Sequence, residues 1–262
     1  MRIQVLKKNE EKINFKIFDI SSAFAGEMRN IMISEIPTLA IEWVDFHKND
    51  SVICDEIIAN RLGLIPLKFD PKKFKFKEEC KCKGKGCSQC QVKLSLKKKG
   101  PCVIYSGDMK STDKSVKPLY DNIPITELNT GQELEFEAYA ELGIGKTHAK
   151  WQGAIVGYRN LAKITITKKG ENCKEAAKFC PRDVFTVKNN KLKVKDADKC
   201  NLCMQCVEKC GKDTIKILPD KNSFVFQVER ACGLSIKNIL IKSMDILSEK
   251  LKEFSKQIEK LK

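Results

Sequence analysis

Thirteen cysteines in a chain of 262 residues constrain it more than any other feature, because most of them fall into two short groups with metal-site spacing. Cys200, Cys203, Cys206 and Cys210 form a C-x2-C-x2-C-x3-C run. In such a run three cysteines bind one iron–sulfur cubane and the fourth reaches another cluster. Cys180, which is followed by proline, supplies the remote fourth ligand. The spacing therefore predicts one [4Fe–4S] cluster on Cys180, Cys200, Cys203 and Cys206.

A two-cluster ferredoxin would repeat this run in the preceding segment. Counting back from Cys180 by the same steps reaches Gly170, Cys173 and Ala176, so two of the three wrapping cysteines are missing. Only Cys173 and Cys210 remain at the other cluster position, and two thiolates cannot hold a cubane. We expect a single cluster, with Cys173 and Cys210 adjacent and able to form a disulfide.

Two alternatives stay open for the predicted cluster. A [3Fe–4S] form would result if one corner were labile, and Zn²⁺ could occupy the same four cysteines. The ferredoxin spacing favours the cubane. By itself, such a cluster would indicate an electron-transfer protein.

A second cysteine group lies in a segment rich in glycine and lysine. Cys80, Cys82, Cys87 and Cys90 form C-x-C-x4-C-x2-C. Four thiolates within eleven residues suit tetrahedral Zn²⁺, and a closed four-sulfur site is structural rather than catalytic. Four free thiols are the alternative, because a C-x-C opening is less diagnostic than paired C-x2-C motifs.

The net charge of +15 is concentrated in one segment, because residues 68–99 hold twelve lysines and three acidic residues. Two filled four-cysteine sites would each carry a charge of −2 and lower the net charge to about +11. A basic surface favours nucleic acid or acidic protein patches. Scattered lysines without arginine are more typical of a solvated face.

The first part of the chain predicts a hairpin, a helix and a strand. Apolar and polar residues alternate over residues 1–20, which favours two antiparallel strands. A helix over about residues 22–36 follows, capped by Ser21 or Ser22 and stopped by Pro37.

The middle of the chain predicts mainly β structure. A strand is expected over residues 39–46, and then a second helix that Asp50 or Ser51 caps and Gly63 closes. Residues 92–168 mostly favour strands.

The C-terminal segment predicts one helix of about 26 residues, or about 39 Å at 1.5 Å per residue. Apolar residues recur along it at steps of three and four, a near-heptad stripe that needs a partner surface. We expect another subunit to cover it; packing within its own domain is the alternative. The stripe comprises Ile236, Leu240, Met244, Leu247, Leu251, Phe254, Ile258 and Leu261.

The sequence contains no recognisable catalytic constellation. His47 and His148 have no nucleophile or carboxylate at a catalytic spacing. Residues 145–147 read Gly-Lys-Thr, but a P-loop would need glycine where Ala140 stands, and the segment that follows reads as extended. No apolar run approaches about 20 residues and the N-terminus has no apolar signal region, which predicts a cytoplasmic chain without membrane contact. Three lone cysteines are expected to be small buried hydrophobes: Cys54, Cys102 and Cys232.

Four segments together resemble a known family. FAGEMRNIMISEIPTLAIEWVDF at 24–46 and DEIIANRLGLIPL at 55–67 are similar to the alpha-type assembly motif of RNA polymerases. HAKWQ at 148–152 and GYRN at 157–160 are similar to the archaeal branch of that family. Over almost its full length the chain resembles the alpha-like D-type family of archaeal DNA-directed RNA polymerase subunits.

The resemblance implies an α+β fold of three domains. An alpha-subunit-like dimerisation domain would comprise residues 1–48 and 222–262. A mainly-β domain inserted at 49–168 would carry the zinc loop near 80–90, and residues 169–221 would form a ferredoxin-like iron–sulfur domain.

The resemblance also implies partners. The first and last helices would pack against the smaller subunit L, and this heterodimer would nucleate assembly with subunits N and P and dock the second-largest catalytic subunit. Nucleotidyl transfer would belong to the two largest subunits, and DNA would be contacted only through the complex. Members of the family vary in cluster content. The residues of the matching motifs expected at the assembly surface are Arg29, Asn30, Asp55, Glu56, Arg61 and Leu62.

Two other classes of function compete with this expectation. A ferredoxin-like electron-transfer protein needs little besides the cluster, whereas some 200 residues here would lie outside it. A zinc-ribbon nucleic-acid binder would bind DNA in isolation with a steep salt dependence. The non-catalytic assembly subunit is the function that the sequence favours.

Overall fold

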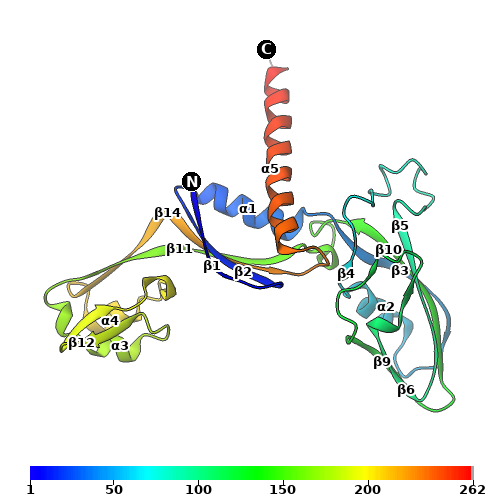
Figure 1. Ribbon diagram of the computed structural model, residues 1–262, viewed down its shortest axis with the longest axis horizontal. Coiled ribbons are helices and arrows are strands. Elements are labelled where there is room, and N and C mark those ends of the chain that lie inside the picture. Colours follow the sequence, from blue (N-terminus) through cyan, green and yellow to red (C-terminus); the bar gives the residue numbers. More distant parts are fainter. Residues whose placement is uncertain (261–262) are drawn as a thin grey trace. The chain divides into compact units, whose positions relative to one another are not determined.

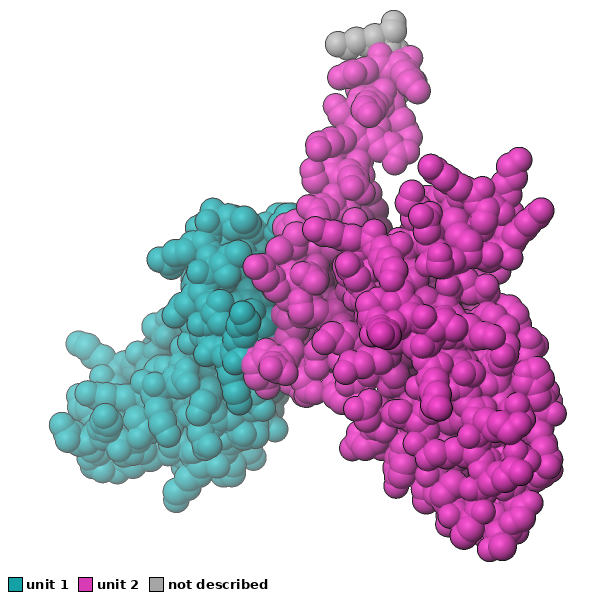
Figure 2. Space-filling view, turned by 45° about the vertical axis from the view of Figure 1, so that its right-hand side comes forward, with its two compact units in different colours: residues 1–8, 13–27, 157–227 teal, residues 9–12, 28–156, 228–262 magenta. Residues whose placement is uncertain are grey.

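The computed structural model describes residues 1–260, and the chain divides into two compact units, each built from segments far apart in the sequence (Figure 2). Unit 1 comprises Met1–Lys8, Ile13–Glu27 and Gly157–Gln227. Unit 2 comprises Asn9–Lys12, Met28–Val156 and Val228–Lys262. The mixture of helices and strands confirms the expected α+β class.

Unit 1 is organised around a four-stranded sheet in the order β1-β2-β14-β11 (Figure 1). Its strands are β1 (Arg2–Lys8), β2 (Lys12–Phe18), β14 (Ile215–Arg230) and β11 (Ala154–Ile166). The antiparallel pairing of β1 with β2 confirms the predicted N-terminal hairpin.

Aromatic side chains pack against one another on the buried face of this sheet. Alternation along β2 places Phe15 on that face, where its ring stacks on Phe226 of β14 with centroids 5.4 Å apart. Tyr158 of β11 packs against Phe226 at 5.2 Å and against Phe224 at 5.7 Å. These contacts join strands from the two ends and the middle of the sequence.

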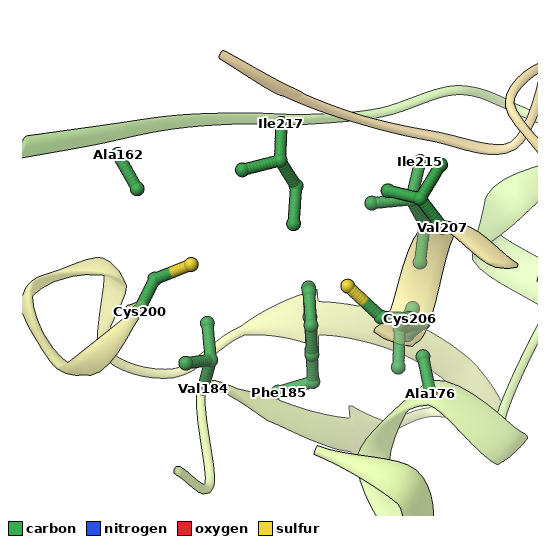
Figure 3. Packing of buried hydrophobic residues seen from close by; sticks show 10 residues of the cluster. Ala162, Ala176, Val184, Phe185, Cys200, Cys206, Val207, Ile215 and Ile217 are labelled. Carbon is green, nitrogen blue, oxygen red and sulfur yellow. The ribbon is translucent and has the colours of Figure 1, made fainter. Parts of the chain in front are cut away.

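Residues 167–214, which lie between β11 and β14, form a small cysteine-rich module whose hydrophobic core also includes Ala162 of β11 and Ile217 of β14 (Figure 3). Four elements build it: α3 (Glu175–Phe179), β12 (Phe185–Lys188), β13 (Lys191–Val194) and α4 (Gln205–Cys210). β12 and β13 pair antiparallel. The buried residues include Ala176, Val184, Phe185, Val207 and Ile215.

Unit 2 contains a second four-stranded sheet, in the order β3-β10-β5-β7. Its strands are β3 (Thr38–Asn49), β10 (Glu133–Gly143), β5 (Gln91–Lys99) and β7 (Lys110–Ser111). Two short pairs accompany it: β4 (Leu67–Lys68) with β8 (Lys117–Pro118), and β6 (Cys102–Tyr105) with β9 (Pro124–Leu128). The prediction of mainly β structure in this region is confirmed.

The predicted start of the second helix is wrong. α2 (Asp55–Gly63) has Cys54 at its N-cap and no side-chain cap, so neither Asp50 nor Ser51 caps it. The amide of Asn49 explains the difference, because its oxygen accepts the Ser51 N–H and its nitrogen donates to the Ile53 carbonyl. These bonds hold a turn where a helix was expected to begin. α1 (Ser22–Ser34) begins as predicted, with the Ser21 hydroxyl oxygen accepting the Phe24 N–H.

Residues 145–153 cap the C-terminus of α1. The N–H of Lys146 donates to the Ser34 carbonyl at 2.7 Å, and the N–H of Gly153 donates to the Ile33 carbonyl at 3.3 Å. At Gly145 a Cβ would lie 2.5 Å from the Ile33 carbonyl oxygen, so this close approach requires glycine. The Gly-Lys-Thr motif is therefore explained by local structure.

α5 (Ile236–Glu259) is the long C-terminal helix that the apolar stripe predicts, and the Ser235 hydroxyl accepts the N–H of Asn238 at its start. Ile236 and Ile239 are buried, whereas every residue from Ser248 to Lys260 is exposed. Leu261, the last residue of the predicted stripe, lies outside the described residues. No helix in the described part of the chain combines the length and the apolar composition that a bilayer crossing needs.

The observed strands depart from the expected domain division in two places. β11 lies wholly inside the expected insert at 49–168 but pairs in the sheet of unit 1, and β14 runs without a break through the limit at residues 221–222. The three-domain division stays a prediction.

Candidate metal centres

Cys80, Cys82, Cys87 and Cys90 form a group whose four sulfur atoms all lie within 4.8 Å of one another. Sγ–Sγ distances are 3.5 Å for Cys80–Cys87, 3.6 Å for Cys82–Cys90 and 3.8 Å for Cys87–Cys90. Four sulfurs at tetrahedral positions 2.3 Å from a zinc ion would be about 3.8 Å apart. The spacing therefore fits one tetrahedral ion.

The backbone of this loop turns back on itself through left-handed residues. The loop connects β4 to β5, and Lys83, Gly84 and Gly86 have φ values of 53°, 80° and 87°. At Gly86 a Cβ would also lie 2.5 Å from the Gln91 amide oxygen, so a side chain there would be strained in two ways. The reversal lets Cys80 and Cys82 face Cys87 and Cys90.

Two thiols of this group have pKa values shifted in opposite directions by their surroundings. Burial acts to raise the pKa of Cys82, but hydrogen bonds from Cys80, Cys90 and the Gly86 N–H outweigh it and bring this pKa to about 6. Burial raises the pKa of Cys90 to about 12, although the Cys87 N–H donates to its sulfur at 3.3 Å. A thiolate is therefore favoured in the group at neutral pH, as metal binding requires.

A carboxylate that the sequence did not single out supports this loop. Glu141 of β10 is buried and accepts hydrogen bonds from Lys77 at 2.8 Å and from Gln91 at 2.9 Å. Its hydrogen bond and charge, together with the charges of Cys90 and Cys82, raise the pKa of Lys77. Glu141 thus connects both ends of the cysteine loop to the central strand of its sheet. Along β10 Glu141 follows the alternation of polar and apolar residues, as the other glutamates do. No local pattern in the sequence indicates that it contacts the cysteine loop.

The cysteines of the predicted cluster come from two segments of the cysteine-rich module. Cys180 follows α3, Cys200 follows a short 3₁₀ turn at Ala197–Lys199, and Cys206 lies in the first turn of α4. Cys203 is exposed between them. The sulfurs of Cys200 and Cys206 point toward each other in the module core, near Val184, Phe185 and Ile217 (Figure 3).

The sulfur atoms of Cys180, Cys200, Cys203 and Cys206 are spaced differently from those of the Cys80 group. Within the described part of the chain, the Cys80 group is gathered at single-ion distances, whereas the Cys180 set is not. A cubane carries its thiolates on the outer corners of a four-iron core and needs a wider arrangement. The donor set, three cysteines on one wrapping loop and one from a separate segment, fits such a cluster.

The wrapping loop directs backbone N–H groups at the sulfurs. Leu202 and Met204 have φ values of 61° and 63°, which curl the chain between the cysteines. Burial raises the pKa of Cys200, and the Leu202 N–H opposes this effect. Burial raises the pKa of Cys206 to about 11, with Cys180 and Cys200 adding to the effect. Negative charge at the other three cysteines thus acts against ionisation of Cys206.

The other cluster position of the ferredoxin repeat is closed in this chain. Cys173 and Cys210 are joined by a disulfide. At Gly170 a Cβ would lie 2.1 Å from the carbonyl oxygen of Thr214, so a cysteine does not fit there. Ala176 is fully buried in the module core. Packing thus occupies the places that two ligands would need.

The candidate assembly residues of α1 are at the surface. Arg29 and Asn30 are both exposed. The Arg29 guanidinium donates from Nε to the carbonyl of Val156 at 3.1 Å, which fixes the side chain along the end of β11. Its Nη1 also donates to the Asn30 amide oxygen at 3.5 Å, so the two candidate residues contact each other.

The candidates on α2 divide between surface and core. Asp55, Glu56 and Arg61 are exposed, and Arg61 donates from Nη1 to the Ile125 carbonyl at 2.7 Å. Leu62 is fully buried, so its side chain is not at the surface of this chain, and the role of the motif in assembly stays a prediction. Leu62 lies four residues after Ile58, which is also buried, so these two residues make the helix face that packs on the domain.

The lone cysteines and the histidines lie outside both cysteine groups. Cys232 is buried as expected, whereas Cys102 is half-buried and Cys54 is exposed, so the prediction fails for Cys54. His148 is exposed and its Nδ1 accepts the N–H of Lys150, which caps a 3₁₀ turn. His47 is exposed on β3.

Comparison with known proteins places these features in a family. Residues 44–157 match the RNA polymerase Rpb3/RpoA insert domain. The chain is 39% identical to DNA-directed RNA polymerase subunit Rpo3 of Methanosphaera stadtmanae over 259 residues, which cover 95% of this chain and 96% of that protein. It is 37% identical to subunit Rpo3 of Archaeoglobus fulgidus, with 99% and 98% covered, and 36% identical to that of Pyrococcus horikoshii, with 100% and 99% covered.

Proposed function

This chain belongs to the Rpo3 family, the D-type subunits of archaeal DNA-directed RNA polymerase, and on that premise we propose that it is the polymerase's non-catalytic assembly subunit. In this proposal it forms a heterodimer with subunit L, and the pair nucleates assembly with subunits N and P and docks the second-largest catalytic subunit. Nucleotidyl transfer lies on the two largest subunits, and this chain meets DNA only within the complex.

The exposed apolar end of α5 is the observation that carries the proposal. Leu251, Phe254 and Ile258 are 60%, 61% and 45% exposed, although they share one face of the helix. This end of α5 stands clear of the rest of unit 2 (Figure 2). Such a face is costly in water and is typical of a subunit interface.

Co-expression of the full chain with its subunit L is the direct test. We expect a 1:1 heterodimer that survives size-exclusion chromatography and accepts subunits N and P. A chain that remains monomeric beside subunit L, and that exchanges electrons with a reductase, would instead favour the ferredoxin-like electron-transfer function.

We further propose that the two cysteine sets hold different metals. Zn²⁺ at Cys80, Cys82, Cys87 and Cys90 would bind as a closed structural site, supported by the tetrahedral sulfur spacing. One [4Fe–4S] cluster at Cys180, Cys200, Cys203 and Cys206 is supported by the wrapping loop and by the closed second position. When bound, the cluster supplies a rigid crosslink between the two ligand segments.

Cys90→Ser is expected to lower bound zinc from one ion per chain to a small fraction of that. Cys90 is fully buried and its sulfur lies within 3.8 Å of two others in the group, so an oxygen ligand there should lower metal affinity strongly. Metal analysis of the purified full chain provides the measurement. Cys102→Ser is the matched control, since Cys102 lies outside the group, and a Cys90→Ser chain that keeps a full zinc ion would contradict the assignment.

A further inference from the structure

Arg159 of β11 carries a buried nitrogen without a hydrogen-bond partner in the described structure, close to the predicted cluster. Its Nη1 is one of two such buried side-chain atoms. The neighbouring Nη2 donates to the backbone carbonyl of Asp198, two residues before Cys200. The guanidinium is therefore held against the segment that leads into a cluster ligand, with one donor left over.

The groups around Arg159 do not balance its positive charge. Burial lowers the pKa of Arg159, a negative charge at Cys200 or Asp198 would raise it, and nearby Arg182 lowers it. The Asp198 carboxylate is itself paired with Lys16 of β2 at 2.5 Å. Within the described residues, no carboxylate forms an ion pair with Arg159. A cation that is partly buried beside another cation is costly unless an anion balances it.

The predicted cluster would be such an anion. Four thiolates on a [4Fe–4S]²⁺ core sum to a charge of −2, and one-electron reduction makes this −3. Arg182 follows Cys180 by two residues, and Arg159 is tied to the segment of Cys200. The two cations thus stand beside both ligand segments.

We propose that Arg159 is the cation that balances the iron–sulfur cluster and donates its free Nη1–H to a cluster sulfur, which raises the reduction potential. The inference rests on the proposed cluster and adds a residue that the cysteine pattern does not contain. Hydrogen bonds to the sulfurs and local charge are two of the factors that set the potential of such clusters. Arginine suits this position because its planar fork can bond a carbonyl and a second acceptor at once.

The test is a potentiometric titration of the full chain, purified without oxygen and followed by the EPR signal of the reduced cluster. Iron and sulfide are measured first in each protein. We expect Arg159→Met to shift the reduction equilibrium at least tenfold toward the oxidised cluster, which is about 59 mV for one electron. Arg159→Lys should recover part of this shift. Lys163→Met, which removes an exposed cation from the same strand, should leave the potential unchanged.

The outcomes separate this inference from the assignment of the cluster. A wild-type chain without iron and sulfide would overturn both. A wild-type chain with a cluster, together with an unchanged potential in Arg159→Met or an equal shift in Lys163→Met, would overturn only the role of Arg159. If Arg159→Met loses the cluster altogether, Arg159→Lys and Arg159→Gln decide the question. Retention by the lysine variant alone supports the charge role, and retention by both or by neither refutes it.

Discussion

Cys203→Ser is expected to unfold the cysteine-rich module, residues 167–214, and to weaken assembly with the larger polymerase subunits while sparing the contact with subunit L. The module contributes seven of the ten buried residues in its core, and two of the seven are the cluster ligands Cys200 and Cys206. A core of this size contributes little stability alone, so folding should depend on the metal. Cys203 is exposed, so its substitution removes a ligand without disturbing packing.

Hydrogen exchange of the full chain should locate the effect. We expect loss of protection across residues 167–214 in Cys203→Ser, with α5 and the sheet of unit 2 unchanged. A reductant must be present, because the Cys173–Cys210 disulfide would otherwise constrain the unfolded module. Cys54→Ser, an exposed cysteine outside both groups, is the control. Equal loss of subunit L and of the larger subunits would show that the module and the heterodimer contact cannot be separated.

Local sequence patterns predicted a large part of this fold. The alternation of residues 1–20 predicted the hairpin of β1 and β2, and steps of three and four predicted α5. Cysteine spacing predicted the group at Cys80–Cys90, because a metal loop is formed by residues close in sequence. In each case the relevant contacts lie within a few residues or repeat with a fixed period.

The features that sequence reasoning missed depend on contacts between distant residues. The Asp198 carboxylate pairs with Lys16 of β2, and the Asp198 backbone carbonyl accepts a hydrogen bond from Arg159 of β11. No local sequence pattern relates these three positions. Leu62 belongs to the family motif, which indicated a place at the surface. It is buried because α2 packs on its domain through this residue. The start of α2 depends on the side chain of Asn49, whose hydrogen bonds to the backbone of Ser51 and Ile53 hold a turn before the helix.

The positive charge of segment 68–99 is partly balanced by residues that lie far from it in the sequence. Several of its lysines pair across the β5–β10 ladder, including Lys93 with Glu137 at 2.9 Å and Lys97 with Glu135 at 2.6 Å. Such exposed cross-strand pairs each contribute little to stability. They do show that part of the local excess of positive charge is balanced by β10, which supports a solvated face over a nucleic-acid site.

The double substitution Leu251→Ser with Phe254→Ser is expected to weaken binding to subunit L by about 100-fold or more. A 100-fold loss needs about 1.4 kcal/mol from each side chain, because every 1.4 kcal/mol changes affinity tenfold, and truncation of a residue at the centre of an interface can cost this much. Both residues are mostly exposed in this chain, so their loss should leave its own unfolding temperature unchanged. Binding is measured by titration of the purified chain with subunit L, and stability by thermal unfolding of the chain alone.

Lys252→Ser with Lys256→Ser is the matched control, because it makes the same substitution on the same two turns of α5 outside the apolar stripe. Helix propensity changes by a similar amount in the two pairs, so a difference between them reports contact with the stripe rather than fraying of the helix. If both pairs weakened binding to subunit L equally, the helix itself and not its apolar face would be the requirement. If neither did, the exposed end of α5 would have to serve a partner other than subunit L, and the heterodimer would form through α1 alone.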